Sequence, residues 1–274
     1  MAIIINVEEL KEMIREKMNL AIVDVRAKTK EFASGEKAYE HSHLPGALFL
    51  DIKEDLAGES TFFPHTEKLA EKLGQLGIQD DSVIVLYDQG NHRAASKAWA
   101  VLHYLGHEKI HILDGGFKSW INSENEVTNV IPKLKFTTYH AQPRKEFVVD
   151  IDYVKNKLSK KASRLIDSRS PDRFIGKLEP KYKKAGHIPG AKNYHAKLVF
   201  ENNGTWKEKE HLSEHFSKLE KKDEIMVSCG SGNSACMNVV ALKEAGFKDV
   251  KIYPGGFGEW IEDERNEIEQ GEGK

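Results

Sequence analysis

The stretch IMVSCGSGNSACMNVVALKEAG, residues 225–246, carries the pattern from which the fold can be read. The apolar run at residues 225–228 predicts a buried strand, and residues 237–245 predict a helix that Gly246 closes. Between them lies a loop of small residues that begins with Cys229. Such a loop places a thiol at the positive end of a helix, among backbone N–H groups.

Cys229 has two interpretations. In an electropositive loop of this kind the thiol pKa falls from about 8.5 to roughly 3.5–7.5, which would make Cys229 a thiolate nucleophile. A buried structural residue is the commoner state of a lone cysteine. The loop alone leaves both interpretations open.

The composition describes a globular protein with room for one large or two ordinary domains. The chain has 274 residues, of which 39% are hydrophobic and 31% charged. The formal net charge of -2 argues against a general binder of nucleic acid or of membrane surfaces. No apolar run is long enough for a signal peptide or a membrane helix, so we expect no membrane association.

The two cysteines, Cys229 and Cys236, are too few for a disulfide framework and indicate a reducing compartment, which we take to be the cytoplasm. Cys236 is interpreted as an apolar core residue of the helix. No Cys/His cluster has the spacing of zinc ligands, so the sequence predicts neither a metal nor a cofactor.

The same series of motifs occurs twice in the chain, at offsets of 140 to 144 residues. The pairs are Asp24-Val25-Arg26 with Asp167-Ser168-Arg169, residues 43–47 with 187–191, residues 84–87 with 225–228, and residues 114–120 with 254–260. This order predicts a tandem duplication. We expect one domain at residues 1–125, a linker at 126–147 and a second domain at 148–274. Alternating strands and helices predict a parallel sheet covered by helices on both faces in each domain.

The two copies differ at the loop after the central strand. Asp88 stands in the first copy where Cys229 stands in the second, and the first loop is one residue longer. The first domain therefore keeps the fold without a sulfur nucleophile. This difference favours a catalytic role for Cys229.

The ordered set of motifs resembles the tandem-domain rhodanese family of thiosulfate and 3-mercaptopyruvate sulfurtransferases. It comprises the two Asp-x-Arg segments, the two His-aliphatic-Pro-Gly-Ala segments, the Cys229 loop and the two Gly-Gly-Phe-x-x-Trp segments. The resemblance covers nearly the whole chain. It implies a five-stranded parallel sheet in each domain and a catalytic cysteine in the second domain only.

The resemblance also implies a mechanism. The Cys229 thiolate takes a sulfur atom from a donor, becomes a persulfide and passes the sulfur to an acceptor, in two half-reactions. The N–H groups of the loop would surround the persulfide, and the loop residues after Cys229 are Gly230, Ser231, Gly232, Asn233 and Ser234. The glycines at 230 and 232 permit positive φ and close approach. Asn233 departs from the family pattern.

The donor follows from charge. Thiosulfate-specific members carry Arg and Lys where this chain has Gly230 and Ser231, so this loop is similar to that of 3-mercaptopyruvate sulfurtransferases. Arg173 stands where those enzymes bind the donor carboxylate, whereas a second family Arg is replaced by Tyr182. The resemblance therefore favours 3-mercaptopyruvate, with thiosulfate as the alternative.

The family also proposes a Ser-His-Asp relay, for which Ser231 and His43 match the first two members. The third position falls near Phe32, which is no acid. A structural role in a turn is the alternative for His43, because His187 repeats it in the second copy. Arg26 and Arg169 are interpreted as structural partners of carboxylates in their own domains.

The sequence also bears on two rival classes of protein. A Cys-based phosphatase needs an Arg where this chain has Ala235, which argues against phosphate chemistry. A non-catalytic regulatory rhodanese-like module is the second rival. As partners we expect a small sulfur donor and an acceptor such as cyanide, a small thiol or thioredoxin, and we expect a monomer.

Overall fold

The structure, a computed structural model, describes residues 2–16, 19–58, 62–160 and 164–272. The chain divides into two compact units, Met1–Arg144 with Asn202–Trp206, and Lys145–Glu201 with Lys207–Lys274. The segment that the sequence predicts as a linker thus belongs, as far as Arg144, to the first unit. The inclusion of Asn202–Trp206 in that unit had no signal in the sequence.

The described residues of the first unit form a parallel sheet in the order β1-β5-β4-β2-β3. Its strands are β1 (Ile4–Ile5), β2 (Leu20–Asp24), β3 (Leu48–Phe49), β4 (Val83–Tyr87) and β5 (Ile110–Leu113). Its helices are α1 (Val7–Arg15), α2 (Gly35–His41), α3 (Thr66–Gln75), α4 (Arg93–Tyr104) and α5 (Gly116–Asn122).

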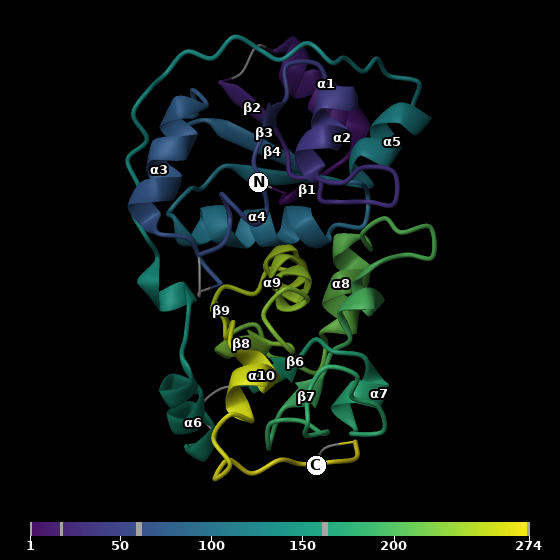
Figure 1. The fold of residues 1–274 in the computed structure, drawn as a ribbon. Coiled ribbons are helices and arrows are strands. Elements are labelled where there is room, and N and C mark those ends of the chain that lie inside the picture. Colours follow the sequence, from purple (N-terminus) through teal and green to yellow (C-terminus); the bar gives the residue numbers. More distant parts are fainter. Residues whose placement is uncertain (1, 17–18, 59–61, 161–163, 273–274) are drawn as a thin grey trace. The chain divides into compact units, whose positions relative to one another are not determined.

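Local sequence explains these elements. All residues of the central strand β4 are buried, as a parallel strand covered on both faces requires. Helix α1 begins with a capping box, because the Asn6 side chain accepts the Glu9 N–H and the Glu9 carboxylate accepts the Asn6 N–H. Figure 1 shows α1, α2 and α5 on one face of the sheet and α4 on the other.

The described residues of the second unit repeat this plan with the sheet order β7-β6-β8-β9. Its strands are β6 (Arg164–Asp167), β7 (Lys192–Asn193), β8 (Ile225–Ser228) and β9 (Val250–Ile252). Its helices are α6 (Ile151–Ser159), α7 (Pro171–Phe174), α8 (Lys209–His215), α9 (Ala235–Glu244) and α10 (Gly256–Trp260), with short 3₁₀ turns η1 (Lys145–Phe147) and η2 (Ala196–Val199).

The α/β architecture with two parallel sheets is confirmed, but the expectation of five strands in each sheet is wrong for the second unit. There the counterpart of β1 is reduced to one parallel bridge between Val148 and Ile252. A single bridge is too short to continue the ladder as a strand. The short helices α2, α7 and α8 were not predicted, because seven or fewer residues carry too little periodicity.

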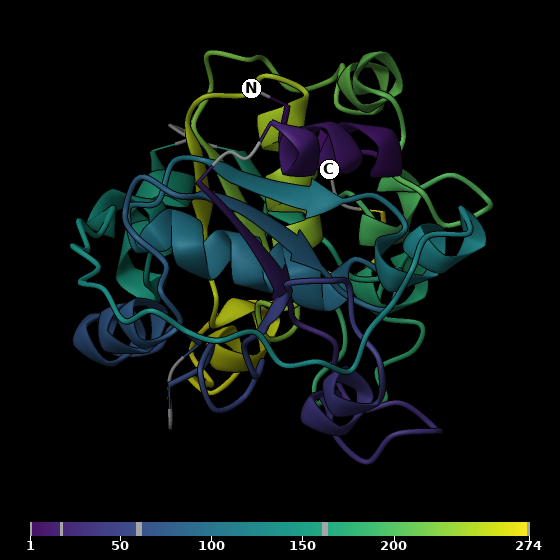
Figure 2. The same cartoon turned by 90° about the horizontal axis from the view of Figure 1, so that it is seen from above.

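The segment after α5 is extended and runs around the first unit, as Figures 1 and 2 both show. It pairs with that unit at both ends, because Thr128 forms an antiparallel bridge with His43 and the Arg144 N–H donates to the Tyr104 carbonyl. None of the helices in the described ranges has the length and apolar character required to cross a membrane.

Candidate active site

Cys229 lies directly after β8, and α9 begins at Ala235, two residues earlier than predicted. The cysteine is 3% exposed. The backbone N–H groups of Ser231, Ser234 and Ala235 lie close enough to its sulfur atom to lower the pKa of the thiol. The loop therefore surrounds the sulfur with backbone amides, an arrangement that can stabilise a negative charge.

The expected fall in the pKa of the Cys229 thiol is not what this structure has. Burial raises that pKa above its ordinary value, and the Asp167 carboxylate raises it further. The amides of Ser231, Ala235 and Ser234 lower it, but they do not offset the loss of solvation. The pKa of the thiol is raised because the sulfur is enclosed, and the loop sequence does not reveal that enclosure.

A second glycine motif supports this loop from α10. The Phe257 N–H donates to the Cys229 carbonyl at 2.8 Å, and the Gly258 N–H donates to the Gly230 carbonyl at 3.0 Å. A side chain at Gly256, whose φ is +57°, would overlap the Cys229 carbonyl oxygen. The repeated Gly-Gly-Phe segment thus positions the cysteine loop, a role that the sequence did not indicate.

The two loop glycines have different roles. Gly232 has a φ of +80°, as expected for a residue in a tight ring of amides. The expectation of positive φ is wrong for Gly230. Close approach explains that glycine instead, because a Cβ there would lie 3.1 Å from Tyr182 Oη and 3.4 Å from Arg173 Nη2.

Arg173, the predicted carboxylate anchor, therefore lies beside the cysteine loop. Its Nε and Nη2 atoms bind Glu179, at 3.1 Å to Oε2 and 2.7 Å to Oε1. Burial opposes ionisation of Glu179, but hydrogen bonds and charges from Arg173, the Lys181 amide and Arg169 hold its pKa below the usual range. The Nη1 group of Arg173 has no partner in the described part of the chain, which leaves one edge of the guanidinium for a ligand.

Tyr182 is a residue of the site whose role the sequence did not predict. Its hydroxyl donates to the Gly230 carbonyl at 2.7 Å. Burial, together with the negative charge that Cys229 can carry, raises the pKa of this phenol. A neutral hydroxyl therefore stands at the position where the family pattern has a second arginine.

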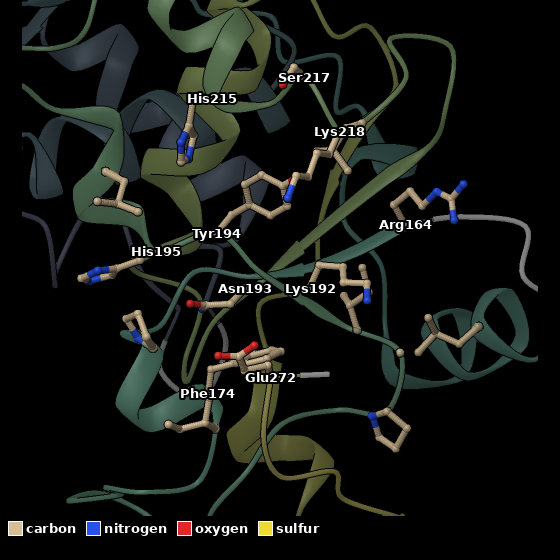
Figure 3. Close-up of a pocket in the computed structure, with 18 of the residues that line it drawn as sticks. Arg164, Phe174, Lys192, Asn193, Tyr194, His195, His215, Ser217, Lys218 and Glu272 are labelled. Carbon is tan, nitrogen blue, oxygen red and sulfur yellow. The ribbon is translucent and has the colours of Figure 1, made fainter. Parts of the chain in front are cut away.

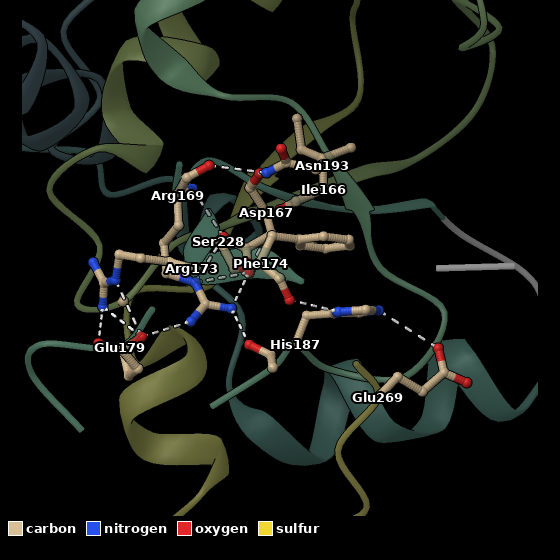
Figure 4. A network of polar contacts seen from close by, with 12 residues as sticks. Ile166, Asp167, Arg169, Arg173, Phe174, Glu179, His187, Asn193, Ser228 and Glu269 are labelled. Atoms are coloured by element: carbon tan, nitrogen blue, oxygen red, sulfur yellow. Dashed lines mark hydrogen bonds and ion pairs between the residues drawn. The ribbon is translucent and has the colours of Figure 1, made fainter. Parts of the chain in front are cut away.

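The site rests on a buried ion pair, shown in Figure 4 with Arg169 and Arg173 converging on Glu179. Arg169 Nη2 binds Asp167 Oδ2 at 2.6 Å, and the guanidinium lies over Phe257, 4.1 Å from the ring centroid. The first unit repeats this pair with Arg26 and Asp24 at 2.6 Å. The structural interpretation of both arginines is confirmed.

The corresponding ring of amides in the first unit is occupied by its own carboxylate. Asp88 Oδ1 accepts the N–H groups of Gly90 and His92 at 2.8 and 3.1 Å, and Oδ2 accepts those of Ala94 and Ala95 at 3.1 and 3.2 Å. The first unit therefore keeps an anion ring that is filled from within and has no thiol.

The remaining predicted residues fall in two groups. Ser231 is exposed and Asn233 and Ser234 are half-buried in the loop, where Ser231 and Ser234 act through their amides. His43 is fully buried in the first unit; its Nδ1 lies 2.7 Å from the Tyr39 carbonyl and its Nε2 3.2 Å from that of Val130. With both nitrogens engaged, His43 has no atom for a proton relay, and the turn role fits it.

Comparison with protein families shows to which family the chain belongs. The Rhodanese-like domain family matches residues 6–123 and 150–263. The chain belongs to the rhodanese family. Within the described residues, the two rhodanese-like units contain no cluster of three His, Cys, Asp or Glu side chains placed to hold a metal ion.

Related proteins extend over nearly the full chain. A protein of Pseudomonas aeruginosa named probable 3-mercaptopyruvate sulfurtransferase is 33% identical over 93% of this rhodanese chain and 93% of its own. The putative thiosulfate sulfurtransferase SseB of Mycobacterium tuberculosis is 31% identical over 98% and 97%. The crystal structure of SseA from Escherichia coli, described as a 3-mercaptopyruvate sulfotransferase, superposes with a TM-score of 0.81 at 29% identity, over 94% and 99%.

Proposed function

We propose that this chain is a sulfurtransferase that moves a sulfane sulfur from 3-mercaptopyruvate to an acceptor through a persulfide on Cys229. The observation that carries the proposal is the placement of Cys229 between β8 and α9, where the amides of Ser231, Ser234 and Ala235 lower the pKa of its thiol. A ring of oriented N–H groups stabilises a negative sulfur without adding a competing charge. The activities named for the related proteins support the same reaction class.

In the first half-reaction the Cys229 thiolate attacks the donor sulfur and a sulfur–sulfur bond forms. The carbon–sulfur bond of the donor breaks, and its electron pair moves into the enolate of pyruvate. The donor thiol proton then passes to that carbon, which leaves a persulfide anion within the amide ring. An acceptor such as cyanide takes the outer sulfur as thiocyanate and regenerates the thiolate.

For the donor, Gly230 and Ser231 contribute no charge, and Arg173 is already half neutralised by Glu179. A site with one partly engaged guanidinium suits a monoanionic keto acid better than a thiosulfate dianion. Arg173 Nη1 would bind the donor carboxylate, and the amides of Gly230, Ser231, Gly232, Asn233 and Ser234 would line the ring. Thiosulfate is the alternative donor.

The first unit is proposed to be a non-catalytic domain, because the Asp88 carboxylate fills its ring. The proposed acceptor is cyanide, a small thiol or thioredoxin. We further propose a cytoplasmic location and a monomer.

The test is turnover of each donor with cyanide, followed as thiocyanate, together with mass spectrometry of the protein after donor alone. We expect the gain of one sulfur atom at Cys229 and ping-pong kinetics. Cys229→Ser should abolish both, whereas Cys236→Ser, at the other buried cysteine, should keep both. Turnover that survives Cys229→Ser would refute the enzyme proposal, and a higher kcat/KM for thiosulfate would reverse the donor assignment.

A further inference from the structure

The second unit carries a cavity of about 1030 Å³ on its β7 side, away from the residues of the cysteine loop. We call it the β7 groove. Apolar side chains of Leu165, Phe174, Tyr194 and Leu198 line it, and Ser217 lies at one end. Figure 3 shows Tyr194 and Lys218 in its upper part and Phe174 and Glu272 in its lower part. A cavity of this size exceeds what a small metabolite needs.

In the first unit, an extended segment of the chain covers the face that corresponds to the β7 groove. There the extended segment of residues 128–142, which we call the strap, passes from His43 to the end of α3. The Thr137 N–H donates to the Gly74 carbonyl at 2.9 Å. A Cβ at Gly74 would lie 2.5 Å from the Thr137 carbonyl oxygen, so the strap lies directly on the helix end.

The tail of the second unit repeats the beginning of this strap. The Trp260 indole donates to the Glu267 carbonyl at 2.9 Å, as the Trp120 indole does to that of Glu126 at 2.8 Å. Glu269 bridges His187 as Thr128 bridges His43. The tail thus reaches the groove along the path of the strap.

The two ends of the groove match the two anchor points of the strap. Pro189 and Gly190, next to His187, line one end. Ser217 lines the other and corresponds to Gly74, at an offset of 143 residues in the shared pattern Leu-x-Glu-x-apolar-small. In the first unit the strap lies along this path, whereas in the second unit the β7 groove lies along it.

We propose that the β7 groove binds an extended, acidic and apolar segment of a partner protein, laid along the path that the strap takes in the first unit. From Val130 to Thr137 the strap spans seven steps, or about 23 Å of extended chain, which sets the length of the bound segment. Alternate apolar side chains of the segment would face Leu165, Phe174 and Tyr194. Its backbone would meet the Ser217 end of α8.

The acidic character follows from comparing the two copies. Arg164, Lys192 and Lys218 line the groove, and their counterparts in the first unit are the uncharged residues Ala21, Leu48 and Gln75. Two positions change the other way, from Ile131 to Glu272 and from Lys72 to the neutral His215. The two groove histidines, His195 and His215, have pKa values lowered by burial and stay neutral near pH 7. Across these positions the groove has gained positive charge, with Lys192 and Lys218 exposed and Arg164 bound to Asp223 at 3.2 Å.

The experiment uses two fluorescent peptides on the full-length Cys229→Ser protein, so that it does not depend on activity. One peptide is the strap sequence, residues 128–142, and the other replaces its Lys133 and Lys135 by Glu. We expect the acidic peptide to bind about 3- to 10-fold more tightly in fluorescence anisotropy, as two added ion pairs with the exposed cations of the groove allow.

Two matched charge reversals locate the site. Lys218→Glu, in the groove, should weaken the acidic peptide at least about fivefold, and Lys222→Glu, exposed outside it, less than about twofold. A photoreactive group at the peptide position of Phe136 should crosslink to the segment that contains Tyr194 or Ser217. Absence of saturable binding, equal effects of the two reversals, or crosslinks to the first unit would each overturn the proposal.

Discussion

Gly256→Ala tests whether the second glycine motif positions the nucleophile. The new Cβ would overlap the Cys229 carbonyl oxygen, so α10 and the cysteine loop must move apart. The same substitution in the first unit, Gly116→Ala, creates the same overlap with the Asp88 carbonyl oxygen. The φ angles, +57° and +54°, are nearly equal, so the two variants are a matched pair.

Two contributions set the expected loss of unfolding free energy. A left-handed backbone costs a residue with a Cβ about 1–2 kcal/mol. Separation of the loop also breaks the hydrogen bond from the Phe257 N–H to the Cys229 carbonyl, 2.8 Å long, which contributes about 0.5–1.5 kcal/mol. We therefore expect each variant to lose about 1.5–3.5 kcal/mol of unfolding free energy. A displacement of about 1 Å at a reacting atom lowers the rate about 100-fold, and only Gly256→Ala moves Cys229.

The assay combines thiocyanate formation with urea unfolding of both variants. Gly190→Ala, whose φ is +80° and whose Cβ would meet nothing within 4 Å, controls for backbone strain alone. It should lose about 1–2 kcal/mol and keep its activity. If Gly256→Ala and Gly116→Ala lose activity equally, or Gly256→Ala stays within about threefold of the wild type, the α10 contact does not position the nucleophile.

Three further predictions follow from the site. Tyr182→Phe removes the hydrogen bond to Gly230, and we expect kcat/KM to fall about 3- to 10-fold with unchanged stability of the first unit. An unchanged kcat/KM would show that the phenol has no part in holding the loop. Because burial raises the pKa of the Cys229 thiol, the thiolate fraction grows as pH rises, so donor kcat/KM should increase through and beyond about pH 8.5. A pH-independent rate between pH 7 and about 9 would contradict the raised pKa. Asp88→Ala leaves four amides of the first ring without an acceptor and should cost about 2–4 kcal/mol of unfolding free energy. Asp88→Asn should cost less, because it keeps one oxygen. Equal losses of the two variants in urea unfolding would argue that the carboxylate does not fill the ring.

The duplication gives this protein an internal comparison that bears on both proposals. One strand–loop–helix ring holds a carboxylate at Asp88 and the other a thiol at Cys229, although both rest on the same buried Asp–Arg pair. One sheet edge carries its own strap, and the other carries an open groove with added cations. In each case the fold is kept while one copy gains a site that can bind or react.

Much of the architecture was predictable because its signals are local. Apolar runs such as residues 83–87 and 225–228, followed by small-residue loops and helices closed by glycine, give the α/β class directly. The repeated order of motifs gives two copies, and the difference between Asp88 and Cys229 predicts the location of the chemistry. Hydrophobic period and turn chemistry act over a few residues, so they can be read without the fold.

The properties of the site depend on contacts across long separations, and these had no local signal. The raised pKa of the Cys229 thiol follows from its burial, and the Phe257 N–H of α10 holds the Cys229 carbonyl. Tyr182 reaches Gly230 from 48 residues away, and Glu179 takes up half of the Arg173 guanidinium. Desolvation and pairing of charges depend on which surfaces meet, and only the packed structure decides that.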